Sequence, residues 1–152
     1  MKVTRKSVFE TNSSSMHSLA MIGKDRMGTY NFEENVVIQS DEYGWSGDDL
    51  NSPLEKLSYI ATMIQYKDCS CAVEDSKYFK WLAEMFKDYT GSNLIYAPYD
   101  KKDEYNRDGY VDHQSTDTLD DQWSDDEDKF KSKMKDIVFN DKYFIIIDND
   151  NH

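Results

Sequence analysis

The stretch from Ser52 to Gly91 constrains the fold more than any other part of the chain. Its first four residues, Ser52-Pro53-Leu54-Glu55, place a serine at an N-cap, a proline at the first helical position and a glutamate at the third. Apolar residues then recur at helical spacing, at Leu54, Leu57, Ala61 and Ile64, with Tyr59, Met63 and Tyr66 beside them. This pattern predicts a helix that runs to about Lys67 and buries one face.

A second helix is predicted to follow almost at once. It begins near Asp75-Ser76, and Gly91 stands where a left-handed C-terminal cap would end it. Its apolar face carries Phe79, Leu82, Met85 or Phe86, and Tyr89. Two consecutive amphipathic helices need a partner layer to cover their apolar faces.

Strand-like segments flank this helical pair. Alternation or β-branched residues predict strands at Ser7–Glu10, Met16–Ile22, Thr29–Glu33, Asn35–Gln39 and Asn93–Tyr99. The continuous apolar run Tyr143–Ile147 predicts a strand in the middle of a sheet, covered on both faces. Asp41–Asp49 and Asp100–Leu119 are predicted loops.

A third helix is predicted after Ser124-Asp-Asp-Glu127, which has the form of a capping box. Its inward residues would be Phe130, Met134, Ile137 and Val138. The predicted order along the chain is several strands, two helices, a strand, a loop, a helix and a strand. This order is typical of an α+β protein. A length of 152 residues corresponds to one domain, so we expect a single domain over 1–152, with about three helices on a mixed or mostly antiparallel sheet.

Acidic residues dominate the C-terminal third of the chain. The whole chain has a net charge of −12, and between Asp112 and Asp128 no lysine or arginine occurs. Such a field repels nucleic acid and attracts basic protein surfaces. The candidate partner-binding residues are Asp117, Asp120, Asp121, Asp125, Asp126, Glu127 and Asp128. The alternative is that these acids only keep the protein soluble.

The sequence contains no stretch of about 18 apolar residues, the length that a membrane span needs. The basic N-terminus, Lys2–Lys6, precedes serine and glutamate rather than an apolar run, which argues against a secretory signal. The two cysteines, Cys69 and Cys71, are too few for a disulfide framework or a four-ligand zinc site. We therefore expect a cytoplasmic protein with no membrane contact, no cofactor and no metal.

Two short polar segments could carry chemistry. The first runs from Glu10 to Ser18 and holds His17 among four serines; the second is Asp112–Ser115, which contains His113. Histidine and serine together can form a general base with a nucleophile, or a cradle for phosphate oxygens. The candidate catalytic residues are Ser15, His17 and His113, and the candidate ligand-binding residues are Asn12, Ser13, Ser14, Ser18, Asp112, Gln114 and Ser115. The alternative is structural, because serine and asparagine also build turns.

The two segments, V-F-E-T-N-S-S-S-M-H-S and G-Y-V-D-H-Q-S, resemble a family of small proteins encoded by bacteriophages and prophages. Members of that family open with basic residues and V-F-E-T-N-S-S-S-x-H-S, and have a later D-H-Q-S. The resemblance covers about 18 residues of the chain. It implies a phage origin, the cytoplasm of an infected bacterium, and a shared site at residues 12–15, 17–18 and 112–115. It implies no particular activity.

Two hypotheses follow for function. The first is an acidic accessory protein that binds, and modulates or inhibits, a host protein with a basic, nucleic-acid-binding surface, without binding nucleic acid itself. The second is a small enzyme, or a protein that binds nucleotides or phosphates, with a Ser/His site built from residues 12–18 and 112–115. Sequence alone leaves enzymatic activity and oligomeric state open.

Overall fold

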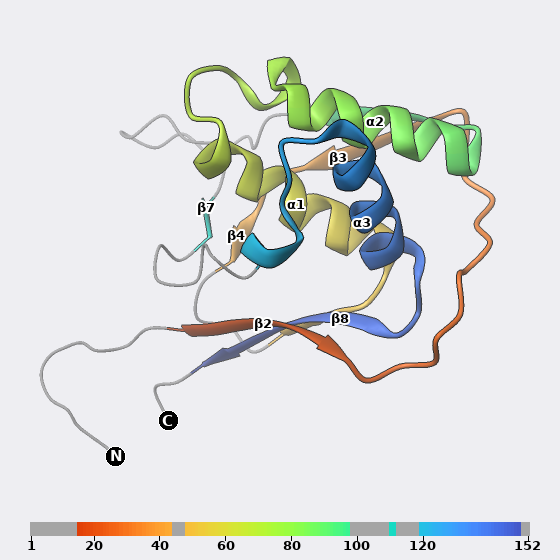
Figure 1. Ribbon diagram of the computed structural model, residues 1–152, viewed down its shortest axis with the longest axis vertical. Coiled ribbons are helices and arrows are strands. Elements are labelled where there is room, and N and C mark those ends of the chain that lie inside the picture. The colour runs from red at the N-terminus through yellow and green to blue at the C-terminus, as the bar shows by residue number, and fades with distance from the viewer. Residues whose placement is uncertain (1–14, 44–47, 98–109, 112–118, 150–152) are drawn as a thin grey trace, which may run out of the picture.

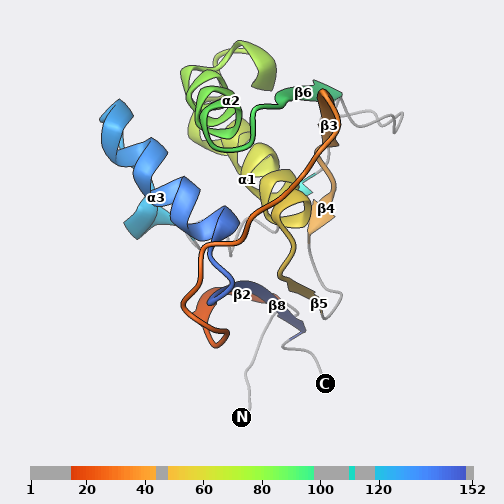
Figure 2. The same ribbon diagram turned by 90° about the vertical axis from the view of Figure 1, so that its right-hand side faces the viewer.

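Helix α1 (Pro53–Lys67) lies in the middle of the protein, with the other helices and the strands arranged around it (Figure 2). The computed structural model describes residues 15–43, 48–97, 110–111 and 119–149. The predicted capping box of α1 is confirmed: the Glu55 amide donates to Ser52 Oγ, and the Glu55 carboxylate accepts from the Ser52 amide. Leu57, Ala61 and Ile64 of the predicted apolar face are buried, as are Tyr59 and Met63 beside them, and burial extends beyond that face to Lys56, Ile60 and Thr62.

Helices α2 (Lys77–Thr90) and α3 (Glu127–Phe139) pack against α1 and against each other. Ser76 caps α2 by accepting from the Tyr78 amide, and Gly91 ends it at φ 82°, in the left-handed region that favours glycine. The predicted start of α3 is two residues early. Its N-cap is Asp126, which accepts from the Lys129 amide, whereas Ser124 accepts from the Asp126 amide in the turn before the helix.

Three strands form an antiparallel sheet below the helices, in the order β2 (Ser15–Met21), β8 (Tyr143–Asn149), β5 (Asp48–Leu50) (Figure 1). The central position of β8 is confirmed. The prediction that both of its faces are covered is wrong. Ile145 and Ile147 are buried against the helices, while Phe144 and Ile146 on the other face are only half-buried.

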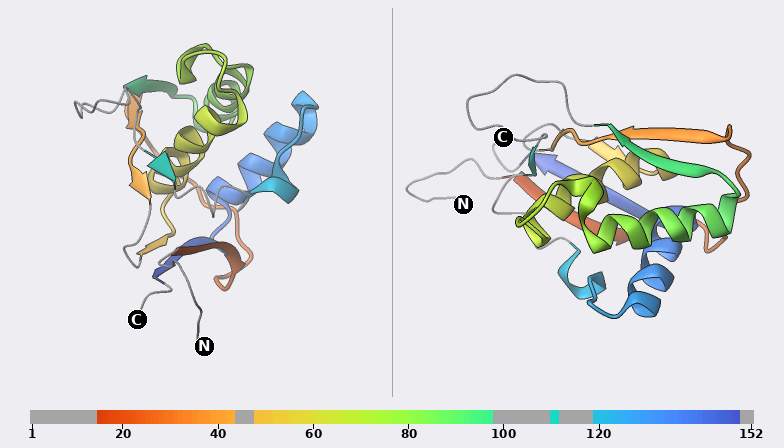
Figure 3. Two further views of the ribbon diagram at one scale, coloured as in Figure 1. Left: turned by 90° about the vertical axis from the view of Figure 1, so that its left-hand side faces the viewer. Right: turned by 90° about the horizontal axis from the view of Figure 1, so that it is seen from above.

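Two parallel pairs complete the fold. β3 (Asn35–Gln39) pairs with β6 (Asn93–Ala97), and β4 (Glu42–Tyr43) pairs with β7 (Tyr110–Val111). Figure 3 shows β3 and β6 side by side on the outside of the helices. The α+β class, the three helices and the mixture of strand directions are therefore confirmed, with the strands divided among three small sheets.

One predicted strand and one predicted loop differ from the structure. Thr29–Glu33 is not a strand, because it pairs with no other segment among the described residues. Its alternation instead reflects Tyr30 and Phe32, whose rings stack at 5.7 Å and pack on the rings of Phe139 and Phe86. The predicted loop Asp41–Asp49 contains β4 and the start of β5. Short 3₁₀ helices η1 (Val73–Asp75) and η3 (Asp120–Gln122) precede α2 and α3. Ser7–Glu10 lies outside the described residues.

Candidate functional site

The acidic segment before α3 contacts the ends of two other helices. The carboxylate of Asp120 in η3 pairs with the ammonium of Lys67 at the end of α1. The carboxylate of Asp125 accepts from the Tyr78 hydroxyl and pairs with Lys77 at 3.7 Å, both at the start of α2. The C-terminus of α1 and the N-termini of α2 and α3 therefore meet at one end of the molecule.

This convergence adds carboxylates that the sequence analysis did not single out. Asp68 follows α1 and accepts from the hydroxyls of Ser70 (2.8 Å) and Ser76 (2.9 Å). Glu74 and Asp75 are exposed in η1, next to Ser76. We call the combined surface the acidic end; it consists of Asp68, Glu74, Asp75, Asp120, Asp121, Asp125, Asp126, Glu127 and Asp128. Three of these acids lie in the run D-C-S-C-A-V-E-D, and this run is the sequence pattern from which they could have been predicted.

Several of these carboxylates also stabilise the fold. Asp126 caps α3, and Glu127 pairs with Lys131 one turn later at 2.6 Å. Glu127 and Asp128, in the first turn of α3, also suit the positive end of its helix dipole. Among the nine carboxylates of the acidic end, four exposed ones have no side-chain hydrogen bond or ion pair to another described residue: Glu74, Asp75, Asp121 and Asp128.

Aromatic rings lie beneath the acidic end. Phe130 in α3 is fully buried and contacts the rings of Tyr78, Trp81 and Trp123 at centroid distances of 5.3 to 5.7 Å. The ammonium of Lys67 lies 5.5 Å from the Trp123 ring, and that of Lys77 lies 5.6 Å from the Trp81 ring. Lys67 and Lys77 are thus each held by a carboxylate and an aromatic face together, a combination that favours cations.

Two carboxylates of the acidic end, Asp125 and Asp68, have pKa values below that of an ordinary aspartate. Burial, with the Asp125 carboxylate beside it, raises the pKa of Tyr78 to about 12. In return, the Tyr78 hydroxyl and the Lys77 ammonium lower the pKa of Asp125. Hydroxyl donors from Ser70 and Ser76 lower the pKa of Asp68. These carboxylates therefore stay charged below the pH at which an ordinary aspartate is protonated.

The second candidate region surrounds His17 on β2. Its Nδ1 atom is hydrogen-bonded to the Tyr59 hydroxyl at 2.8 Å, and the two rings lie 5.8 Å apart. Tyr59 is fully buried in α1, and its ring contacts the buried ring of Tyr43 at 5.0 Å. A half-buried imidazole therefore satisfies a hydroxyl in the core.

The flanks of the two polar segments meet at this tyrosine pair. Val111, the residue before Asp112, is the register partner of Tyr43 in the β4–β7 pair. His17 approaches Tyr59 from β2, and Tyr43 contacts Tyr59 from β4. Segments far apart in the sequence thus approach one buried tyrosine pair from different strands.

The remaining predicted residues of this region are placed as follows. Ser18 is exposed and alternates with His17 along β2, so the two side chains point to opposite faces of the strand. Ser15 is the first residue of β2, opposite Asn149, rather than part of the connection before the strand. Asn12, Ser13, Ser14, Asp112, His113, Gln114, Ser115 and Asp117 lie outside the described residues.

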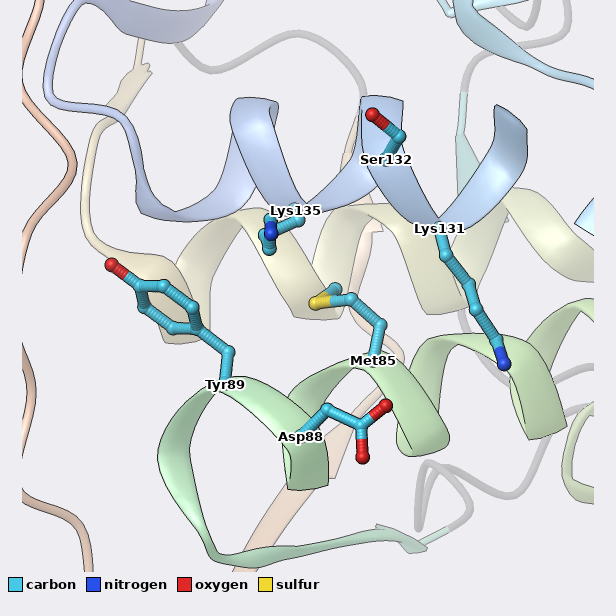
Figure 4. Close-up of a pocket in the computed structure, with 6 residues that line it drawn as sticks. All are labelled: Met85, Asp88, Tyr89, Lys131, Ser132 and Lys135. Atoms are coloured by element: carbon cyan, nitrogen blue, oxygen red, sulfur yellow. The ribbon is translucent and has the colours of Figure 1, made fainter. Parts of the chain in front are cut away.

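A hollow of about 290 Å³ lies between α2 and α3, lined by Met85, Asp88, Tyr89, Lys131, Ser132 and Lys135 (Figure 4). Met85 forms its floor, and Lys131 is already paired with Glu84 and Glu127. The ammonium of Lys135 lies 5.9 Å from the Tyr89 ring. Of the residues predicted for catalysis or ligand binding, His17 and Ser18 lie on β2 and do not line this hollow.

Comparison with protein-family models, with curated proteins and with solved structures found no match for this chain. Among the described residues, no helix is long and apolar enough to cross a membrane. The class that the structure defines is an α+β protein in which carboxylates gather where the C-terminus of α1 meets the N-termini of α2 and α3.

Proposed function

We propose that this chain is a phage-type acidic accessory protein whose acidic end binds a host protein with a basic, nucleic-acid-binding surface, in the cytoplasm of the infected bacterium. The observation that carries the proposal is the convergence of two acidic segments, residues 68–75 and 120–128, with nine carboxylates between them, where the C-terminus of α1 meets the N-termini of α2 and α3. A surface of this kind accelerates and orients association with a positive partner.

The chemistry of the acidic end supports a partner rich in lysine or arginine. Lys67 and Lys77 are each held there by a carboxylate and a ring, so the surface already accommodates cationic side chains. Asp121 and Asp128 are exposed and have no ion pair within the described part of the chain. They are available to an incoming cation without the loss of an internal contact.

Charge reversal at these two residues tests the proposal. We expect Asp121→Lys combined with Asp128→Lys to weaken binding of a fluorescently labelled octalysine peptide about tenfold at 20 mM salt, measured by fluorescence anisotropy, since each reversal replaces attraction with repulsion. Wild-type binding should also weaken as salt is raised to 150 mM.

The matched control reverses two other carboxylates and changes the net charge equally. It is Glu33→Lys combined with Glu34→Lys. These two residues lie next to β6, beyond the C-terminal end of α2, where the Asn93 amide donates to the Glu34 carbonyl. This variant should keep most of the affinity. If both double variants lose affinity equally, binding follows net charge alone and the acidic end is not a defined site.

The His17 region supports a second candidate function, a small enzyme or a protein that binds nucleotides or phosphates. The favouring observation is that His17 and the strand leading to Asp112 both reach the Tyr43–Tyr59 pair. In this proposal His17 and His113 act as the acid–base pair, with Ser15 as the nucleophile. Ser13 and Gln114 would hold the oxygens of the ligand.

Nuclear magnetic resonance of the imidazole rings tests this alternative, because the chain has only three histidines. Inorganic phosphate should shift the ring signals of His17 and His113 together and saturably, and leave that of His152 unchanged. His17→Ala should abolish the response at His113, with the fold verified by circular dichroism. Equal shifts at all three histidines, or none, would reject a shared site.

A further inference from the structure

The hollow between α2 and α3 is bounded at both ends by contacts that fix its shape (Figure 4). At one end Lys131 of α3 pairs with Glu84 of α2 at 2.6 Å. At the other end the ring of Tyr89 stacks on that of Phe139 at 4.4 Å, and the Tyr89 hydroxyl donates to the Gly28 carbonyl at 2.6 Å. Because packed elements hold both ends, the space of about 290 Å³ is preformed, as small-molecule sites usually are.

The lining of the hollow combines an apolar floor with one acidic and one basic rim. Met85 is 3% exposed and forms the floor. Asp88 stands on the α2 rim, three residues after Met85 and so on the same face of the helix. Lys135 stands on the α3 rim, and Figure 4 shows the Met85 side chain between those of Asp88 and Lys135. A molecule lying on the Met85 thioether would have a carboxylate on one side and an ammonium on the other.

The charged groups of the two rims are available to a ligand. The Asp88 carboxylate has no side-chain hydrogen bond or ion pair to another described residue. The Lys135 ammonium lies 5.9 Å from the Tyr89 ring and forms no ion pair with Asp88, although both residues line the same hollow. An acid and a base that stand apart across an apolar floor can each bind one end of a zwitterion, and no internal ion pair is lost.

The balance of charge around the hollow selects among classes of ligand. Lys131 is already neutralised by Glu84 and Glu127, each at 2.6 Å. Asp88 and Lys135 then remain as the two opposed charges of the rims. A phosphate or another simple anion would be repelled by Asp88, and a simple cation would be repelled by Lys135. A molecule that carries both charges is attracted by both rims.

We propose that the hollow between α2 and α3 binds a free α-amino acid with an aliphatic side chain. The ligand's ammonium group pairs with the Asp88 carboxylate, its carboxylate pairs with the Lys135 ammonium, and its side chain covers Met85. The volume of the hollow lies near the lower limit of small-molecule pockets, about 300 Å³, which suits so small a ligand. These contacts involve neither the carboxylates of the acidic end nor a histidine, so the proposal stands whether or not either proposed function holds.

Titration of the isotope-labelled chain with L-leucine, followed by the nuclear magnetic resonance shifts of its backbone amides, tests the proposal. The amides of residues 85–89 and 131–135 should shift saturably, with a dissociation constant on the order of 1 mM, as expected for so small a ligand. Two analogues separate the charges: 4-methylpentanoate lacks the ammonium group, and 3-methylbutylamine lacks the carboxylate. Each should bind about fivefold more weakly than L-leucine, because each leaves one rim without a partner. Inorganic phosphate should not shift these amides.

Substitutions on the two rims locate the contacts. Asp88→Asn should weaken L-leucine binding about fivefold and should not weaken binding of 4-methylpentanoate, which has no ammonium group for Asp88 to bind. Lys135→Gln should weaken L-leucine binding equally and should not weaken binding of 3-methylbutylamine. The matched controls, Glu33→Gln and Lys80→Gln, remove the same charges at exposed positions outside the hollow and should keep the full affinity.

Circular dichroism verifies the folding of each variant. Three results would overturn the proposal. The first is the absence of saturable shifts around the hollow with L-leucine. The second is equal binding of L-leucine and its two analogues, which would mean that neither rim contributes. The third is an equal loss of affinity in the rim variants and in their controls.

Discussion

Replacing Phe130 by alanine should lower the free energy of unfolding by about 3 to 5 kcal/mol, the range for removing a large aromatic side chain from a packed core. Phe130 is fully buried, and its ring contacts those of Tyr78 in α2 and Trp123 after η3. The substitution leaves a cavity where α2, α3 and the acidic end meet. A domain of this size has only about 5 to 15 kcal/mol of stability in total.

Urea unfolding followed by far-ultraviolet circular dichroism measures this loss without relying on Trp81 and Trp123, whose fluorescence the cavity would alter. Phe130→Leu should cost much less, since it refills most of the space. Phe144→Ala is the matched control, because Phe144 is half-buried on the outer side of β8. Equal losses at the two phenylalanines would contradict the assignment of Phe130 as the centre of the cluster.

The second large effect should come from Lys56, a lysine that is 1% exposed in the core. Its ammonium donates to the carbonyl oxygens of Ile137 (2.9 Å) and Asn140 (3.4 Å) at the C-terminal end of α3. Burial lowers its pKa from 10.5 to about 8, against the opposing effect of Asp141 and Asp136. In the folded protein Lys56 therefore loses its proton near pH 8, whereas in the unfolded chain it keeps that proton up to a pH near 10.5.

Because the unfolded state binds more protons between about pH 8 and 10.5, this residue makes stability rise with pH in that range. Compared with Lys56→Met, the wild-type chain should gain about 2 kcal/mol between pH 7 and pH 9.5, at about 1.4 kcal/mol per pH unit above 8. Urea unfolding of both proteins at each pH measures the difference. Lys80→Met, at an exposed lysine of α2, should show no such gain. A pH-independent difference at Lys56 would mean that its ammonium is solvated in the folded state.

Both residues join helix α3 to the rest of the molecule. Phe130 holds its N-terminal half against α2, and Lys56 holds its last carbonyls against α1. Helix α3 also supplies Asp126, Glu127 and Asp128 to the acidic end. The stability of that surface therefore depends on contacts made by α3 with both other helices.

The positions of the helices could be predicted from local sequence patterns alone. The capping box at Ser52 and the left-handed Gly91 are properties of a few neighbouring residues, and both were predicted correctly. The start of α3 was wrong by two residues because Ser124 and Asp126 are both good caps, and only the helix geometry selects Asp126.

Strand pairing could not be predicted to the same degree, since a ladder depends on a partner elsewhere in the chain. The alternation at Thr29–Glu33 was interpreted as a strand, but it serves ring packing by Tyr30 and Phe32. The residues of β4 and β5 form strands because β7 and β8 lie beside them, although their sequence is typical of a loop.

The sequence by itself determined the α+β class, the three helices, the central strand β8 and the acidity of the C-terminal third, because these follow from periodicity, capping and charge along the chain. Only the tertiary structure decided that Asp68, Glu74 and Asp75 join that acidity at one end, and that His17 bonds to Tyr59. It also decided that Asp88 and Lys135 stand on opposite rims of one hollow. These features depend on contacts between segments distant in sequence, which long-range packing and not local preference sets.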